Sequence, residues 1–501
     1  MAFAALILPG VIFIPAYFRE NSCKSRGSDS QNPLPTQPRS WSGAQRREQA
    51  KSSAQLMTLD STGKYLINSR TNRPVFITGE AAWSLQVQLS NEDIQLYLAD
   101  RASRGFNAIL VDLADNYYSD HAPYDHYGNA PFSGPDFTHE NPAYWARVDQ
   151  TISWAAARGV TVFADPAFVG YGCAGGYCQS YRNSSVATVK SYGEFLGARY
   201  RDSSNIVWLI GGDADPEDKN VQSKLDALAN GIRSADSAHL ITTESYRGTS
   251  SIDIWAGREW LDLDALYAEP KDVRAIASAH YLRATLPVFF LEDWYEGEHS
   301  ISQFDVRKEG YSAVLSGCTL GRFFGNYAIW NFSWAPNTKD PWKKQLDSEG
   351  STGQAWLGRL FRSREHWLLV PDTERAVLTA EHTGWHSLNS ISKFFHALLC
   401  REPASTESTL SVAAHTSDGQ TIIAYVPRGD TASLSIDLSK ISDPRSEAKA
   451  WWFSPRDGST NLIGVFATKS HFAFVPPDTN DWVLVVDSSS ANLPPPGSAD
   501  F

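Results

Sequence analysis

The chain has 501 residues, 42% of them hydrophobic, which is enough to bury one large core together with a smaller partner domain. Its 44 basic and 56 acidic side chains give a formal net charge of −12, and no basic stripe is present. This acidic balance argues against nucleic acid as a partner. Aromatic residues make up 12% of the chain, a surplus that also suits stacking on the flat apolar faces of sugars.

The first 18 residues are mostly apolar and carry no charged side chain, which is typical of a signal peptide or a membrane anchor. No basic segment precedes this run, and the basic residues after it favour a cytoplasmic location for the remainder of the chain. Residues 19–56 are rich in Ser, Gln, Pro and Arg, which predicts a disordered linker. We nevertheless expect a secreted or extracellular protein, which residues 1–18 either direct out of the cell or anchor to a membrane.

Apolar strand-like runs then alternate with helix-like stretches. The predicted strands cover residues 74–83, 106–113, 160–166, 205–212, 239–245, 261–269, 287–293 and 322–330. Nearly continuous apolar strands in β-α units indicate a parallel sheet. Eight such units in about 260 residues predict a closed (β/α)8 barrel, which we place at residues 57–375. An open doubly wound sheet is the alternative, although no glycine-rich phosphate loop follows any strand.

A predicted helix separates the first two of these strands. Ser90 is a candidate N-cap with Asp93 three residues later, and Gly105 is expected to end the helix.

The pattern changes in the last part of the chain, where short alternating segments are separated by turn signals. Examples are TLSVAAHTSDGQTIIAYVP, SLSIDL and DWVLVVD. Such segments predict a small antiparallel β-sandwich, placed at residues 376–488 and followed by a tail at 489–501.

Cys173 and Cys178 lie in the glycine-rich stretch GYGCAGGYCQS. A short disulfide is the favoured interpretation for an exported protein, and two free thiols are the alternative. A zinc site is disfavoured because no second Cys or His pair with suitable spacing accompanies them. We expect neither a metal nor an organic cofactor.

Acidic and aromatic residues gather at the ends of the predicted strands, where a (β/α)8 barrel places its active site. The carboxylates are Glu80, Asp112, Asp165, Asp213, Glu244, Glu269, Glu292 and Asp293. Carboxylates can accept hydrogen bonds from sugar hydroxyl groups, and aromatic rings can stack on sugar faces. An acidic and aromatic barrel mouth therefore suits an uncharged polyol.

Two of these carboxylates have the placement that glycoside cleavage needs. The reaction requires one carboxyl that protonates the leaving oxygen and a second that faces the anomeric carbon or an attacking water. Asp213 ends the fourth predicted strand and Glu292 ends the seventh, so they can meet across the barrel rim. A carboxyl separation of roughly 5 Å implies retention of configuration, and a wider gap implies inversion.

Each of these assignments has an alternative. Asp213 could be the N-cap of a following turn, and Glu292 could pair with Arg247 or Arg307. A calcium loop is disfavoured because Asp218 stands where a glycine is required. The acidic residues that follow Asp213 are most simply a solvated turn.

Seven multi-residue segments occur in a fixed order along the chain, namely GEAAWSLQ, YLADRASRGFNAI, NPAYWARVD, VWLIGGDAD, LEDWYEG, WWFSPRDG and DWVLVV. Together they resemble the apiosidase-like glycoside hydrolases, from about Leu59 to Val486. The resemblance implies a (β/α)8 catalytic domain followed by a β-sandwich of the type described as collagen-binding. It also implies that Asp213 is the general acid/base and that Glu292 is the nucleophile or its counterpart.

The sequence departs from the family pattern at the expected pocket. Glu80 stands where the family often has Asp, and Glu244 stands where His is common. The residues expected to contact substrate are Trp83, Glu80, His121, Glu244, Glu269, Trp294, Tyr295 and Trp330. These departures leave the sugar specificity open, and activity on apiose is not assumed.

We therefore expect a monomeric glycoside hydrolase that cleaves O-glycosidic bonds in a plant or microbial polysaccharide or oligosaccharide. The alternative is a catalytically weak carbohydrate-binding or surface adhesion protein that keeps the same barrel. Intact carboxylates at both catalytic positions favour the enzyme.

Overall fold

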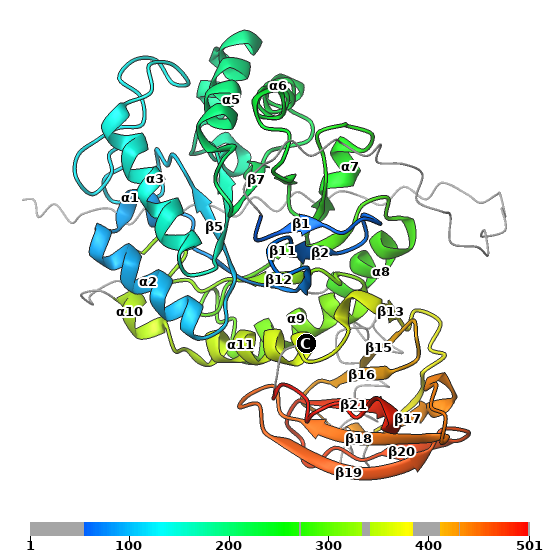
Figure 1. The fold of residues 1–501 in the computed structure, drawn as a ribbon. Helices are drawn as coiled ribbons and strands as arrows, with labels where there is room; N and C mark the ends of the chain where they lie inside the picture. The colour runs from blue at the N-terminus through cyan, green and yellow to red at the C-terminus, as the bar shows by residue number, and fades with distance from the viewer. Residues whose placement is uncertain (1–54, 270–271, 333–340, 384–410, 430, 499–501) are drawn as a thin grey trace, which may run out of the picture. The chain divides into compact units, whose positions relative to one another are not determined.

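The computed structural model describes residues 55–269, 272–332, 341–383, 411–429 and 431–498 (Figure 1). The predictions for residues 1–18 and for nearly all of the linker at 19–56 lie outside these ranges. Gln55 and Leu56, which close the predicted linker, are instead buried, and the Leu56 N–H donates to the Ser204 carbonyl over 2.8 Å. In the ranges that the structure describes, no helix is both long and apolar enough to cross a membrane.

Eight parallel strands form a nearly closed barrel, which confirms the predicted fold class. They are β4 (Ile77–Ala81), β5 (Ala108–Asp112), β6 (Thr161–Asp165), β7 (Ile206–Gly211), β8 (Ile241–Glu244), β10 (Asp264–Tyr267), β11 (Val288–Glu292) and β12 (Gly321–Phe324). Their order in the sheet is β8-β7-β6-β5-β4-β12-β11-β10, and the short strand β9 (Thr249–Ser250) runs antiparallel to β10. The Thr242 hydroxyl donates to the Leu263 carbonyl over 2.9 Å, which links β8 to the segment before β10.

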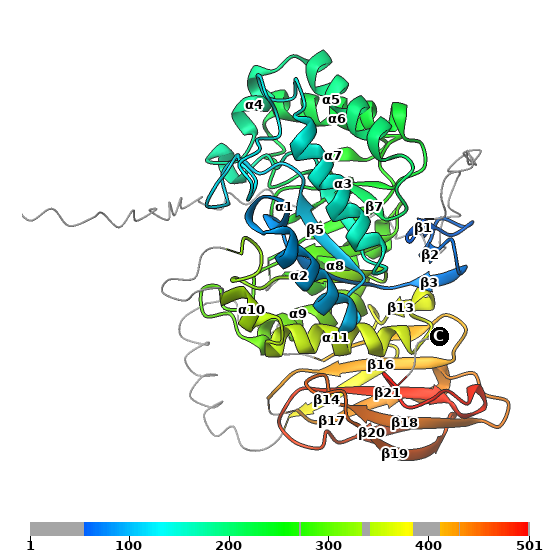
Figure 2. The same cartoon turned by 60° about the vertical axis from the view of Figure 1, so that its left-hand side comes forward.

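Helices connect the strands and lie outside the barrel (Figures 1 and 2). They are α1 (Leu85–Gln88), α2 (Asn91–Ser103), α3 (Pro142–Ala156), α4 (Cys178–Asn183), α5 (Val186–Tyr200), α6 (Lys219–Ala235), α7 (Ser251–Trp255), α8 (Val273–Arg283), α9 (Gln303–Ser316), α10 (Pro341–Gln345) and α11 (Glu349–Arg362). The Ser90 hydroxyl accepts from the Asp93 N–H over 3.2 Å, which confirms the predicted cap of α2. Gly193 and Gly231 let α5 and α6 approach closely, because a Cβ at either position would meet a backbone oxygen of the other helix.

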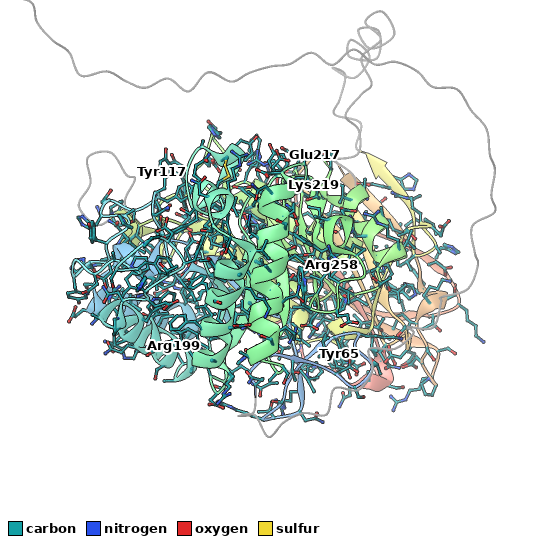
Figure 3. All side chains as sticks on the ribbon, turned by 90° about the horizontal axis from the view of Figure 1, so that it is seen from above. Tyr65, Tyr117, Arg199, Glu217, Lys219 and Arg258 are labelled. Carbon is teal, nitrogen blue, oxygen red and sulfur yellow. A yellow bond between two sulfur atoms is a disulfide. The ribbon has the colours of Figure 1, made fainter. Side chains whose placement is uncertain are left out.

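A three-stranded antiparallel sheet covers the amino-terminal ends of the barrel strands. It consists of β1 (Thr58–Leu59), β2 (Leu66–Asn68) and β3 (Arg73–Val75). Leu66 packs in one apolar cluster with Ile77 and Leu320, which lie at or next to the starts of barrel strands. Figure 3 shows Tyr65, next to β2, at the opposite side of the view from Tyr117 and Glu217, which follow β5 and β7. The strand ends that carry the predicted carboxylates therefore lie away from this sheet.

The C-terminal part is the predicted antiparallel β-sandwich. One sheet has the order β13 (Leu369–Pro371), β15 (Val412–Thr416), β16 (Thr421–Val426), β21 (Trp482–Ser488), β18 (Glu447–Phe453), β19 (Thr460–Ala467), and the other has the order β14 (Leu378–Thr383), β17 (Thr431–Asp437), β20 (His471–Phe474). Because successive side chains of a strand point to opposite faces, the residues of β16 belong alternately to two hydrophobic clusters. Ile422 and Ala424 pack between the sheets, whereas Ile423 and Tyr425 pack against barrel helices, with Tyr425 stacked on Tyr311 of α9 at 4.8 Å.

Buried ion pairs join the barrel to this sandwich. Arg307 of α9 contacts Asp481 at 3.0 Å, and Arg364 contacts Asp487 at 2.8 Å. The same Arg364 donates to the carbonyl of Pro494 over 3.0 Å, so part of the predicted tail is held against the barrel. Because Asp481 engages Arg307, this arginine is not a partner of Glu292, and that alternative from the sequence is wrong.

Candidate active site

Five carboxyl side chains gather at the carboxyl ends of barrel strands, on or next to β5, β6, β7, β8 and β11. They are Asp112, Asp165, Asp213, Glu244 and Glu292. Burial is the largest cause of a raised pKa in each of them. Their charges also interact, because the pKa of Glu292 is raised further by Asp213 and that of Glu244 by both. The structure therefore brings the two predicted catalytic residues into one electrostatic cluster.

Solvent access separates these five residues into two groups. Asp112, Asp165 and Glu244 are buried, whereas Asp213 and Glu292 are partly exposed. Burial raises the pKa of Asp165 to about 8, and burial with repulsion from Asp165 raises that of Asp112 well above its usual range. These two carboxyls are therefore largely neutral at pH 7, and only Asp213 and Glu292 can meet a substrate.

Glu292 is held by a chain of hydrogen bonds. The Tyr295 hydroxyl donates to Glu292 Oε1, and Trp83 Nε1 donates to the Tyr295 oxygen over 2.8 Å. Trp83 follows β4 and Tyr295 follows β11, so two strands fix the position of one carboxylate. The bond from Tyr295 lowers the pKa of Glu292 against the effect of burial, which leaves it at about 8. This arrangement orients Glu292 and partly offsets the effect of burial on its pKa.

Glu244 is the immediate neighbour of Glu292. Among the described residues no N–H or hydroxyl group donates to either oxygen of Glu244. Its carboxyl instead shares a hydrogen bond with that of Glu292, which raises the pKa of Glu244 and lowers the pKa of Glu292. The proton therefore resides on Glu244, and Glu292 accepts from it. Sequence reasoning placed Glu244 in the pocket but did not predict this shared proton.

Asp213 sits on a strained turn. It has a positive φ of 54°, which is uncommon outside glycine, and it follows Gly211 and Gly212, whose φ values are also positive. A Cβ at Gly212 would lie 2.2 Å from the Phe168 ring, so only glycine fits there. Such strain at a site of chemistry is typical of a side chain held in a required direction. One oxygen of Asp213 is buried without a hydrogen-bond partner among the described residues.

The turn after Asp213 matches the solvated turn expected from the sequence. Asp218, not Asp213, is the N-cap of α6, since it accepts from the Val221 N–H over 3.0 Å. Asp218 also pairs with Arg182 at 2.6 Å, and the exposed Asp215 accepts from the Glu217 N–H over 2.8 Å. The N-cap alternative for Asp213 is therefore wrong. Within the described ranges, no group of three or more His, Cys, Asp or Glu side chains is arranged to hold a metal ion.

Aromatic rings line the same end of the barrel. Trp83 contacts Phe168 with ring centroids 5.6 Å apart, and Trp330 contacts both Tyr118 at 5.8 Å and Tyr295 at 6.4 Å. The predicted Trp83, Tyr295 and Trp330 therefore belong to one aromatic group with Glu292. Phe168 was not singled out in the sequence, although its position just after β6 would have identified it.

Trp294 takes a different direction from its neighbour Tyr295. Its half-buried ring lies against His299 with centroids 6.3 Å apart. The ring contact described for Trp294 is therefore with the loop after β11, and not with the aromatic group beside Glu292.

The remaining predicted substrate contacts are Glu80, His121 and Glu269, and Glu80 faces away from the clustered carboxyls. Glu80 is fully buried, and it accepts from the Tyr97 hydroxyl over 2.6 Å and from Arg101 over 2.9 Å. These partners lie on α2, so strand alternation has turned Glu80 outward between strand and helix, and its role is structural. His121 is exposed in the loop after β5, and Glu269 is partly exposed 3.5 Å from Arg247.

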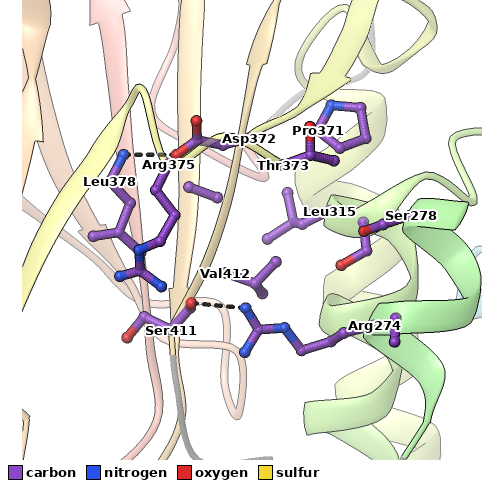
Figure 4. Close-up of a pocket in the computed structure, with 13 residues that line it drawn as sticks. Arg274, Ser278, Leu315, Pro371, Asp372, Thr373, Arg375, Leu378, Ser411 and Val412 are labelled. Atoms are coloured by element: carbon purple, nitrogen blue, oxygen red, sulfur yellow. Dashed lines mark hydrogen bonds between the residues drawn. The ribbon is translucent and has the colours of Figure 1, made fainter. Parts of the chain in front are cut away.

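A separate pocket of about 260 Å³ lies between helices α8 and α9 and the C-terminal part (Figure 4). Its lining includes Arg274 and Leu315 of the barrel helices and Asp372 and Val412 of the C-terminal part. The Leu378 N–H donates to Asp372 over 2.7 Å, and Arg274 donates to the Ser411 carbonyl over 3.3 Å. None of the five clustered carboxyls lines this pocket, so it is not the place of the chemistry.

Comparison with known proteins gives results that agree with this geometry. A family model described as "Apiosidase-like, catalytic domain" matches residues 60–368. The chain belongs to the apiosidase-like family. A second model, described as "Putative collagen-binding domain of a collagenase", matches residues 400–487. With its barrel and family, this apiosidase-like protein is a glycoside hydrolase.

Solved structures of similar fold are also glycoside hydrolases. One described as a glycoside hydrolase is 23% identical, has a TM-score of 0.70, and covers 87% of this chain and 97% of its own. A glycoside hydrolase family 5 protein from Bacteroides vulgatus ATCC 8482 is 24% identical, has a TM-score of 0.69, and covers 87% of this chain and 94% of its own. At sequence identities of 23% and 24%, the similarity to these two structures establishes the fold alone. No protein of curated function matches this apiosidase-like chain.

The Glu244–Glu292 pair predicts a specific change in pH dependence. In a Glu244→Leu variant Glu292 loses a donor, so its pKa rises and the acidic limb of the kcat/KM profile moves up by about one pH unit. A Glu244→Gln variant keeps an N–H donor and is expected to retain the limb of the parent protein. The pH profiles of the two variants, measured side by side, check this, and an equal shift in both would contradict it.

Proposed function

We propose that Asp213 and Glu292 carry out the hydrolysis of an O-glycosidic bond. Asp213 protonates the oxygen of the leaving sugar as its bond to the anomeric carbon breaks, and Glu292 presents its carboxylate to that carbon. Water then supplies the hydroxyl group of the released sugar. One observation carries the proposal: of the five clustered carboxyls, only these two reach solvent. The hydrogen bonds that Glu292 accepts from Tyr295 and Glu244 support the carboxylate role for it and leave the proton-donor role to Asp213.

The pKa values of this pair allow the two carboxyls to share one proton at neutral pH. Burial raises the pKa of Asp213 to about 6 against the attraction of Arg247, and burial with repulsion from Asp213 raises that of Glu292 to about 8. Two interacting carboxyls lose their protons in two steps that belong to the pair. Between the two steps the pair holds one proton, which is the state that general acid catalysis needs.

The expected pH profile of kcat/KM is therefore a bell. Activity falls below about pH 6, because both carboxyls are then protonated and no carboxylate faces the anomeric carbon. It falls again above about pH 8, because neither carboxyl retains a proton for the leaving oxygen. Initial rates at low substrate concentration across this range check the prediction. Activity that keeps rising above about pH 9 would contradict it.

We propose a neutral sugar from a plant or microbial polysaccharide or oligosaccharide as substrate. Trp330 is partly exposed beside Tyr295 and offers aromatic surface near Glu292, which suits the apolar face of a sugar, whereas Trp83 and Tyr295 are buried and hold that carboxylate. An anionic sugar would add repulsion to the ionised carboxylate. Aromatic surface alone does not distinguish among neutral sugars, so the substrate must come from a screen.

The test is the release of reducing sugar from a panel of plant and microbial glycans. The parent protein is expected to cleave at least one of them, and Asp213→Asn and Glu292→Gln variants are expected to lose that cleavage. Glycan binding that survives both substitutions, together with no hydrolysis by the parent, would favour the adhesion protein instead.

We also propose that the protein acts outside the cytoplasm as a monomer. Cys173 and Cys178 form a disulfide, and such bonds are typical of exported proteins. The apolar residues 1–18 would direct the export or anchor the protein to a membrane.

A further inference from the structure

The loop that follows β6 lies directly beside the turn that carries Asp213. The Val169 N–H donates to the Gly211 carbonyl over 2.9 Å, and the Gly170 N–H donates to the Gly212 carbonyl over 3.0 Å. Tyr171 and Asp213 are the next residues on the two segments. The backbone thus places Tyr171 next to the proposed proton donor.

This loop is fixed by several constraints within residues 168–178. A disulfide joins Cys173 to Cys178, and the Cys178 N–H returns to the Val169 carbonyl over 3.0 Å. Gly170 and Gly176 have positive φ, and a Cβ at either would lie 2.2 to 2.5 Å from a backbone oxygen of the loop itself. Such a loop holds its exposed side chains in place before any ligand arrives, which reduces the entropy lost on binding.

Tyr171 of this loop forms an aromatic platform together with Tyr246. The ring of Tyr171 stacks on that of Tyr246, which follows β8, with centroids 5.4 Å apart and planes 9° apart. The Tyr171 hydroxyl group, together with burial, raises the pKa of Tyr246 to about 12. Tyr171 is nevertheless 53% exposed, so part of its ring faces solvent. Tyr246 also interacts with the charge of Asp213, which places the pair near that carboxyl.

We propose that the Tyr171–Tyr246 platform binds the sugar ring on the leaving-group side of the scissile bond. The proposal rests on the function proposed above, since Asp213 marks that side by protonating the leaving oxygen. An exposed aromatic ring beside the proton donor offers a flat apolar surface to the apolar face of a pyranose. The corresponding substrate class is an oligosaccharide or polysaccharide with a sugar, and not a small alcohol, as its leaving group.

The test compares substrates that differ only in the leaving group. The probes are α- and β-linked disaccharides of glucose, mannose, galactose, xylose and arabinose, each beside the glycosyl fluoride of the same sugar. For the pair that the parent cleaves, Tyr171→Ala is expected to lower kcat/KM on the disaccharide about tenfold, which corresponds to about 1.4 kcal/mol. On the fluoride, which has no leaving sugar, kcat/KM is expected to stay within about twofold of the parent.

Tyr171→Phe keeps the ring and removes only the hydroxyl group. It is expected to recover most of the disaccharide rate that Tyr171→Ala loses. An unchanged disaccharide rate in Tyr171→Ala, or an equal loss on the fluoride, would overturn the proposal.

A binding measurement separates this proposal from the hydrolytic function. The Glu292→Gln protein and the same protein with Tyr171→Ala are applied to an array of plant and microbial oligosaccharides. If the parent hydrolyses nothing but Tyr171→Ala abolishes array binding, the hydrolytic function fails while the sugar platform stands. Binding that is unchanged by Tyr171→Ala, or no binding and no hydrolysis at all, would reject the platform.

Discussion

Replacing Glu292 by Gln is expected to lower kcat/KM on the order of a thousandfold or more, the largest effect of any single substitution in this protein. Gln has nearly the same shape and can still accept from the Tyr295 hydroxyl, but it cannot present a negative charge to the anomeric carbon. The loss is expected on every substrate, including those with an excellent leaving group, because the charge acts on the sugar that is retained at the site. Initial rates on a disaccharide and on the matching glycosyl fluoride measure it.

Glu298→Gln provides the control for this substitution. Glu298 lies in the same loop and is partly buried, but its contacts are to the Tyr295 N–H at 3.4 Å and to His299 at 3.7 Å. The kcat/KM of the Glu298→Gln variant is expected to stay within about twofold of the parent. Equal inactivity of the two variants would indicate a disturbed loop, and parental activity of Glu292→Gln would show that another carboxyl faces the anomeric carbon.

The barrel could be predicted because its strands have an unambiguous sequence pattern. β7 is fully buried, so both faces of the strand need apolar residues, and the run VWLIGG has them. The same reasoning located all eight strands, although the stretch predicted at 74–83 divides between β3 and β4, and β12 covers only Gly321–Phe324 of the region predicted at 322–330. The rule that active groups follow the carboxyl ends of such strands then identified Asp213 and Glu292.

The direction of a side chain at a strand end could not be predicted in the same way. Glu80 and Glu244 both end apolar strands, yet Glu80 faces α2 and Glu244 faces Glu292. The difference depends on which face of the strand each residue occupies, and a shift of one residue in strand register reverses that face. The partner that holds Glu80 is Arg101, whose position on α2 gives no signal of the pairing in the sequence.

The proton shared by two carboxyls and the long-range ion pairs could not be predicted from the sequence either. Glu244 lies on β8 at one end of the sheet order and Glu292 lies on β11 towards the other end, so their hydrogen bond depends on barrel closure. Arg307 was considered as a partner of Glu292, but it contacts Asp481 in the other domain. Both cases require tertiary geometry, which residue type and spacing along the chain do not contain.

Replacing Asp213 by Asn is expected to show a loss that depends on the leaving group. On a disaccharide, kcat/KM should fall by about 10² to 10⁴-fold, because the leaving sugar alkoxide is no longer protonated as its bond breaks. On the glycosyl fluoride of the same sugar the loss should stay below about tenfold, because fluoride leaves with little help from a proton donor. The alkaline limb of the pH profile, which reports loss of the proton that the pair shares, is expected to disappear with the Asp213 carboxyl.

Asp215→Asn is the matched control, since Asp215 lies two residues away in the same acidic turn. It is exposed, and its oxygen accepts the Glu217 N–H, a bond that an amide oxygen can also accept. The rates of this variant are expected to stay within about twofold of the parent on both substrates. A loss in Asp213→Asn that is equally large on the fluoride would assign Asp213 a role in binding or folding. The Glu292→Gln variant is expected to lose activity on both substrates. If Asp213→Asn did the same, the two variants would no longer distinguish a proton donor from a carboxylate that faces the anomeric carbon.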